Sequence, residues 1–200
     1  ASSNGSQRDW PTNANGEYSN KDVTIYEAIR KSLNTVAVKC LKDVGILSSI
    51  EFLQNNFEIP LSSERYTATV HGEEEIIGNI AMGYVKEGVT PIDMAGYYQI
   101  FATGGVYDKP STIYKICDEE GNELYTREYA PKEVISPVTA DLMNKLLQGV
   151  AKTGGTGVEA HCKSTEVAGK TGSADGNAQC WFAGVTPEYS CAIWHGQNYK

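Results

Sequence analysis

The sequence predicts an α+β fold, with helices first and a small antiparallel sheet at the C-terminal end. Three strand-like runs, residues 166–172, 180–186 and 190–196, are joined by short turns that contain Gly, Asn or Pro. Such short connections favour antiparallel neighbours, since parallel strands need a crossover of roughly a dozen residues or more. The earlier part of the chain carries helix caps followed by apolar residues at helical spacing. Helices followed by strands, without regular alternation, indicate the α+β class.

The first part of the chain carries helix signals after a polar start. Residues 1–22 are rich in Asn, Ser and Gly and lack periodicity, which predicts a loop or a frayed arm. Thr24 and Glu27 match a capping box, in which the Thr hydroxyl caps the first turn and the Glu side chain reaches back to the cap. We expect a second helix over 36–44 that stops at a glycine, and a short third helix that opens at Ser48.

The middle of the chain changes from helical to strand-like periodicity. Residues 55–88 give mixed signals and predict no element. A Thr-Pro pair followed by an acid predicts a helix over 91–102. Residues 111–117 and 123–127 flank a Gly-Asn turn and predict a hairpin. A Ser-Pro pair then predicts a helix over 137–151, before the strands that close the chain.

Composition and charge exclude several functional classes. The 200 residues hold 25 acidic against 17 basic side chains, for a net charge of −8. That balance opposes binding to nucleic-acid phosphates and to anionic lipid. Five cysteines and three histidines stand at no metal-ligand spacing, so we expect no metal site. The odd cysteine count leaves at least one thiol without a partner in the chain, and we expect most of the cysteines to be buried.

Two short motifs carry groups suited to acyl transfer to a serine. One is Ser-x-Asn at Ser32 and Asn34, which has little weight alone because the same pattern occurs at residues 2–4. The other is the more specific Lys-Thr-Gly-Ser at 170–173. An ammonium supplies positive field, a hydroxyl passes a proton to a leaving amine, and a side-chain amide orients the substrate. Gly172 lets a ligand approach the strand closely, so that an extended peptide can add to it.

The order of these motifs and the segments around them resemble the transpeptidase domain of the penicillin-binding proteins, of the bifunctional, high-molecular-weight class A type. The resemblance runs over nearly the whole chain. It is carried by residues 28–37, 83–84, 89–95, 101–105, 154–157, 168–173 and 181–187. It implies the fold of the serine β-lactamases and penicillin-binding proteins.

The activity implied by the resemblance is a peptidoglycan D,D-transpeptidase without a cofactor. In that family a serine is acylated by a D-Ala-D-Ala stem peptide, and the amine of a second stem peptide takes the acyl group. β-Lactams acylate the same serine. The implied place of action is the extracytoplasmic face of the bacterial cell membrane. The expected partners are stem peptides and β-lactams, not nucleic acid.

The resemblance also implies a role for each motif residue. Ser32 relays a proton to the leaving nitrogen, and Asn34 binds the substrate amide. Lys170 holds the field around Ser32 and the nucleophile, so its ammonium is expected within hydrogen-bond reach, or one water, of the Ser32 hydroxyl. Thr171 and Ser173 meet the substrate carboxylate, and the backbone N–H of Ser173 forms half of the oxyanion hole.

The sequence departs from the family pattern at the nucleophile. The family's Ser-x-x-Lys motif precedes Ser-x-Asn, whereas no lysine of this chain has a serine three residues before it. We therefore expect residues 23–200 to be the C-terminal part of a transpeptidase domain that lacks its nucleophile helix and first strands. Such a fragment is expected to be inactive alone, and to attach to a membrane only through missing upstream parts. The exposed gap also predicts a homo-oligomer or a local rearrangement.

Three alternative functions share these motifs or this fold. A β-lactam sensor ectodomain signals instead of cross-linking. A β-lactamase requires a deacylating base, and the long resemblance to the bifunctional type speaks against it. A non-catalytic domain would only bind or pack. We interpret Gly155, Thr156 and Gly157 as structural rather than as ligand contacts.

Overall fold

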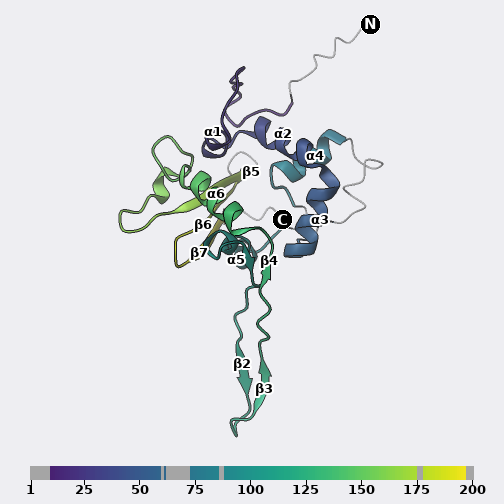
Figure 1. The fold of residues 1–200 in the computed structure, drawn as a ribbon, viewed down its shortest axis with the longest axis vertical. Helices are drawn as coiled ribbons and strands as arrows, with labels where there is room; N and C mark the ends of the chain where they lie inside the picture. Colours follow the sequence, from purple (N-terminus) through teal and green to yellow (C-terminus); the bar gives the residue numbers. More distant parts are fainter. Residues whose placement is uncertain (1–9, 60, 62–72, 86–87, 175–177, 197–200) are drawn as a thin grey trace. The chain divides into compact units, whose positions relative to one another are not determined.

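The chain divides into two compact units, Ala1–Gly88 and Val89–Lys200. The computed structural model describes residues 10–59, 61, 73–85, 88–174 and 178–196, and Figure 1 draws them as a ribbon. In these residues the first unit is helical, and the second combines helices with antiparallel strands. The predicted α+β class, with a sheet at the C-terminal end, is therefore confirmed. No helix in the described ranges is long and apolar enough to cross a membrane.

The described part of the first unit contains α1 (Ile25–Arg30), α2 (Asn34–Val44), α3 (Ile46–Phe57) and α4 (Glu73–Ala81). Helix α2 packs against both α3 and α4. The core between them is apolar. It consists of Ile50 and Leu61, with Ile46, Leu53, Ile59, Ile80 and Val85 packed around them.

Three helices of this unit differ from the sequence predictions, and α2 differs only in beginning at Asn34 rather than at residue 36. Helix α3 begins at Ile46 rather than at Ser48, because Gly45 ends α2 and opens α3 at a φ of 95°. A single left-handed glycine therefore replaces the side-chain cap that we expected. Helix α4 lies in the range for which no element was predicted.

The predicted capping box of α1 is only half formed. The Thr24 hydroxyl accepts from the Glu27 backbone N–H at 3.2 Å, as expected. The Glu27 carboxylate instead pairs with Lys31 at 2.8 Å and with Arg30 at 2.9 Å. Hydrogen bonds from Lys31 and Arg30 hold the pKa of Glu27 below its usual value. Two cations one turn away compete better for the carboxylate than a single backbone N–H does.

The second unit is built around a three-stranded sheet. Its strands β5 (Ala168–Ala174), β6 (Gln179–Val185) and β7 (Ser190–Gly196) pair antiparallel in sequence order, which confirms the predicted meander. Helix α5 (Pro91–Ala102) packs on β6 and β7, and α6 (Pro137–Gln148) packs on β5. Because the two helices also pack on each other, they cover one face of the sheet together.

Both helices of the second unit begin at the caps that the sequence predicted. Thr90 and Asp93 form a complete capping box at α5. The Ser136 hydroxyl accepts from the Thr139 backbone N–H at α6. Each helix has proline in its first turn, where the missing N–H costs nothing.

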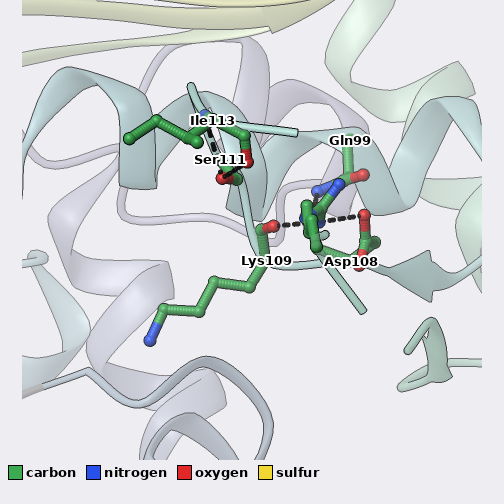
Figure 2. Close-up of polar contacts among 6 residues, drawn as sticks. Gln99, Asp108, Lys109, Ser111 and Ile113 are labelled. Carbon is green, nitrogen blue, oxygen red and sulfur yellow. Dashed lines mark hydrogen bonds and ion pairs between the residues drawn. The ribbon is translucent and has the colours of Figure 1, made fainter. Parts of the chain in front are cut away.

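A long hairpin, which lies between α5 and α6 in the sequence, extends away from this unit (Figure 1). It contains β2 (Lys115–Cys117) and β3 (Glu123–Thr126), both shorter than predicted, and a small bridge forms between β1 (Val106–Tyr107) and β4 (Lys132–Glu133). At its base, the Gln99 side chain donates to the Asp108 carbonyl at 2.6 Å (Figure 2). This hydrogen bond ties the start of the hairpin to α5.

The cysteines are more exposed than expected. Cys40, Cys117 and Cys191 are exposed, Cys162 and Cys180 are half-buried, and no disulfide forms among these five described residues. The prediction that most would be buried is therefore wrong. Cys117 lies in the solvated hairpin and Cys191 on the last strand of a small sheet, where one face meets water.

Candidate functional site

Ser32 lies at the junction between α1 and α2, as the sequence predicted. Its backbone is in the left-handed region, with a φ of 55°. Its N–H donates to the Ile29 carbonyl at 3.1 Å, which closes the end of α1. A non-glycine residue in this conformation costs roughly 1–2 kcal/mol, and such strain is often found at functional sites. The junction thus places Ser32, which is half-buried, in a strained turn between two helices.

Asn34 is the first residue of α2, and its side-chain amide is held in place from a distant segment. Its Nδ2 donates to the Thr12 carbonyl at 2.9 Å. The neighbouring Asn13 is buried, at 5% exposure. The Asn13 Oδ1 accepts from the backbone N–H of Thr35 at 3.2 Å, and its Nδ2 donates to the Glu17 carbonyl at 2.8 Å.

Asn13 therefore caps α2 from 22 residues away. The residue at the local cap position, Leu33, offers no side-chain hydrogen bond. No signal in the sequence separates Asn13 from the other asparagines of a polar loop. The described residues 10–22 form no helix or strand, yet this segment holds the amide of a predicted site residue.

Replacing Asn13 by alanine is expected to lower the free energy of unfolding by about 1–2 kcal/mol. The variant would leave the Thr35 N–H and the Glu17 carbonyl without their present partner. Urea denaturation of the two chains measures the difference. Asn15→Ala is the matched control, because Asn15 is exposed and, among the residues that the structure describes, its side chain bonds only to Glu17, two residues away. A loss no larger than that of the control would contradict the capping role.

The Lys-Thr-Gly-Ser motif lies within β5, an edge strand of the three-stranded sheet. Side chains alternate along a strand, so Thr171 and Ser173 share one face and Lys170 starts from the other. The motif residues pair across to β6 in a regular register. The pairs are Lys170 with Ala183, Thr171 with Phe182, Gly172 with Trp181, and Ser173 with Cys180. An edge strand can accept an added peptide strand, with side chains from both faces in reach.

Lys170 is partly desolvated. Burial lowers the pKa of its ammonium to about 8, because removal from water disfavours the charged form. Its Nζ donates to the carbonyl of Thr171 at 2.8 Å, which turns the side chain along its own strand. A positive charge screened from bulk water interacts more strongly with a nearby anion than an exposed one does.

The Thr171 hydroxyl has a partner that the sequence analysis missed. Thr156 Oγ1 lies 2.6 Å from Thr171 Oγ1. The interpretation of Thr156 as structural does not predict this contact, because a Gly-Thr-Gly turn carries no signal for a partner 15 residues further on.

The structure thus brings together two groups of predicted residues, each within its own unit. Ser32 and Asn34 lie at the α1–α2 junction of the first unit, and residues 170–173 lie within β5 in the second. The expected hydrogen bond between Ser32 and Lys170 stays a prediction. In the first unit a hydrogen bond holds the Asn34 side chain at the start of α2, and in the second unit hydrogen bonds hold the Lys170 and Thr171 side chains on the edge strand β5.

Comparison with known proteins identifies the family of this chain. The model of the penicillin binding protein transpeptidase domain matches residues 2–194. The chain belongs to the penicillin-binding protein transpeptidase domain family. The resemblance inferred from the motifs is therefore confirmed.

Curated relatives of this transpeptidase domain include penicillin-binding protein 1A of two clostridia. The protein of Clostridium acetobutylicum is 34% identical over 188 residues, which cover 94% of this chain and 22% of the relative. That of Clostridium botulinum is 32% identical over 176 residues, which cover 88% of this chain and 20% of the relative. The chain thus spans about a fifth of the length of these relatives.

Solved structures show the same fold. Penicillin-binding protein A from M. tuberculosis, an imipenem acyl-enzyme complex, matches with a TM-score of 0.74 at 19% identity, over 92% of this chain and 45% of that one. Penicillin-binding protein 1A from Haemophilus influenzae matches with a TM-score of 0.71 at 23% identity, over 96% of this chain and 32% of that one. The predicted penicillin-binding transpeptidase fold is therefore confirmed.

Proposed function

We propose that this chain supplies the substrate-binding and proton-relay residues of a D,D-transpeptidase that cross-links peptidoglycan stem peptides and is acylated by β-lactams. The observation that carries the proposal is the desolvated Lys170 ammonium on an edge strand, next in sequence to a hydroxyl held by Thr156. A positive charge and an oriented donor on one edge strand suit a ligand that ends in a carboxylate. The family membership supports the same reaction class.

Each motif residue has a separate task in this proposal. Ser32 passes a proton to the leaving nitrogen, and Asn34 binds the substrate amide. Lys170 stabilises negative charge that develops during acyl transfer. Thr171 and Ser173 bind the substrate carboxylate, while Gly172 leaves the strand backbone open to the ligand.

The acylated serine would come from a Ser-x-x-Lys segment outside these 200 residues, because the pattern is absent from the sequence. The 200-residue chain alone would then be inactive. We further propose that the whole protein acts at the extracytoplasmic face of the bacterial membrane, where stem peptides are found.

Mass spectrometry after incubation with a labelled penicillin tests this function. We expect no covalent adduct on the 200-residue chain, and one adduct on a longer chain in which a Ser-x-x-Lys segment precedes it. Ser32→Ala in the longer chain should slow formation of the adduct, because the proton relay is lost. The absence of any adduct on the longer chain, or an adduct on the 200-residue chain, would contradict the proposal.

Acylation of the longer chain is also expected to depend on pH through Lys170. Its pKa of about 8 means that the ammonium is lost as the pH rises through that value, and the acylation rate should fall with it. Lys170→Arg is the control: a guanidinium stays charged beyond about pH 12, so the fall should disappear. A pH–rate profile of labelled penicillin measures both. An unchanged profile in Lys170→Arg would assign the fall to another group.

The same pKa predicts the effect of pH on stability. The pKa of Lys170 falls from 10.5 to about 8 on folding, so the unfolded chain binds more protons between these values. The Lys170 contribution to the free energy of unfolding should therefore rise as the pH increases through this window. Comparing Lys170→Met with the unsubstituted chain isolates that contribution.

A further inference from the structure

Thr156 lies in the loop after α6, outside the motifs that the proposed function uses. Its hydroxyl oxygen is 2.6 Å from that of Thr171, which pairs with Phe182 inside the sheet. At this distance one hydroxyl donates its proton and the other accepts it. The direction of the bond decides which group remains able to donate to a ligand.

The glycines on either side of Thr156 allow the loop to approach its neighbours closely. A Cβ on Gly155 would overlap the carbonyl oxygen of Val150. A Cβ on Gly157 would lie 3.2 Å from the Phe182 ring and 3.4 Å from the Thr171 methyl group. The Gly157 N–H also donates to the Val150 carbonyl at 3.0 Å. The loop is therefore packed against the end of α6 and against β5, which fixes where the Thr156 side chain begins.

We propose that Thr156 is a positioning residue for carboxylate binding by Thr171. In this arrangement Thr156 donates its proton to Thr171 Oγ1, and Thr171 then donates its own proton to the carboxylate of a stem peptide or a β-lactam. A hydroxyl that accepts one hydrogen bond becomes a better donor of the next, because the bonds polarise each other. A carboxylate only accepts, so it favours this direction over the reverse one.

This inference rests on the proposed function, because it requires that Thr171 meets the carboxylate. It goes beyond that function by assigning a task to a residue outside both motifs. Thr156 is exposed and Thr171 is half-buried, so a ligand at the strand edge can reach the pair. The geometry also makes the two residues energetically dependent on each other, which a double-mutant cycle measures.

The experiment measures the acylation rate of the longer chain by labelled penicillin, in Thr156→Val, Thr171→Val and the double variant. Thr156→Val should slow acylation about 3- to 10-fold, the range expected for one lost hydrogen bond. In the Thr171→Val background, the same change should have no further effect. Thr156→Ser keeps the hydroxyl and should retain more activity than Thr156→Val. Thr112→Val, an exposed threonine in the hairpin segment, is the matched control and should leave the rate unchanged.

The outcomes separate this inference from the proposed function. Suppose first that Thr171→Val slows acylation. A normal rate in Thr156→Val would then overturn the positioning role alone, and so would a double variant in which the rate losses of the two single variants multiply. No acylation of the unsubstituted longer chain would overturn both. Thermal unfolding establishes that each variant is folded. If the Thr156→Val variant is not folded, Thr156→Ala replaces it, both alone and combined with Thr171→Val, with the same expected rates.

Discussion

Replacing Lys170 by methionine is expected to slow acylation by penicillin about 10²- to 10³-fold in a chain that carries the Ser-x-x-Lys segment. Methionine has a similar length and no charge, so the variant removes the ammonium while keeping most of the side-chain volume. The loss is large because the ammonium would stabilise charge that exists only in the transition state. The pKa of about 8 indicates that this charge is partly removed from water, where its field is weakly screened.

At neutral pH the same variant should be at least as stable as the unsubstituted chain. Burial disfavours the Lys170 ammonium, so removing the charge relieves a desolvation cost. Against this stands the lost hydrogen bond from Nζ to the Thr171 carbonyl, which contributes about 1 kcal/mol. Lys163→Met is the matched control, since Lys163 is exposed in the loop before β5 and should affect neither property. A Lys170→Met protein that acylates at the rate of the Lys163→Met protein would show that Lys170 has no electrostatic role.

Local sequence signals predicted the elements that local interactions determine. The capping box at Thr90 and Asp93 and the Ser136 cap each involve residues three positions apart, and both helices begin where expected. The closing sheet followed from its short turns alone. The predicted strand over 166–172 contained all of the motif except Ser173, whereas β5 runs two residues further, over Ala168–Ala174.

Contacts between distant segments explain what the sequence did not predict. The pairing of β1 with β4 contains only two residue pairs, and it forms only because the hairpin brings the two strands together. The cap of α2 comes from Asn13, although asparagine in a polar loop has no distinguishing pattern. The contact between Thr156 and Thr171 likewise depends on how closely a glycine-flanked loop packs against β5.

Gly105→Ala is expected to produce the largest loss of stability, about 3–5 kcal/mol in the free energy of unfolding. Gly105 is buried at a φ of 98°, a conformation that costs an L-residue roughly 1–2 kcal/mol. A Cβ there would also overlap the Ile135 carbonyl oxygen and lie 2.9 Å from its carbonyl carbon. This backbone cannot move aside easily, because the Gly105 carbonyl accepts from the Val134 N–H at 2.9 Å.

The adjacent glycine provides the control for Gly105→Ala. Gly104 has a φ of 70°, but among the described residues a Cβ there would meet only the Pro137 ring, at 4.0 Å. Gly104→Ala should therefore pay only the conformational cost of about 1–2 kcal/mol, and the difference between the two variants isolates the steric clash. Urea denaturation measures both. Gly105 connects α5 to the segment before α6 and lies outside the proposed site, so acylation per folded molecule should stay normal at temperatures where the variant remains folded. Equal losses in the two variants would mean that the Ile135 backbone yields, and that this connection between the helices is not rigid.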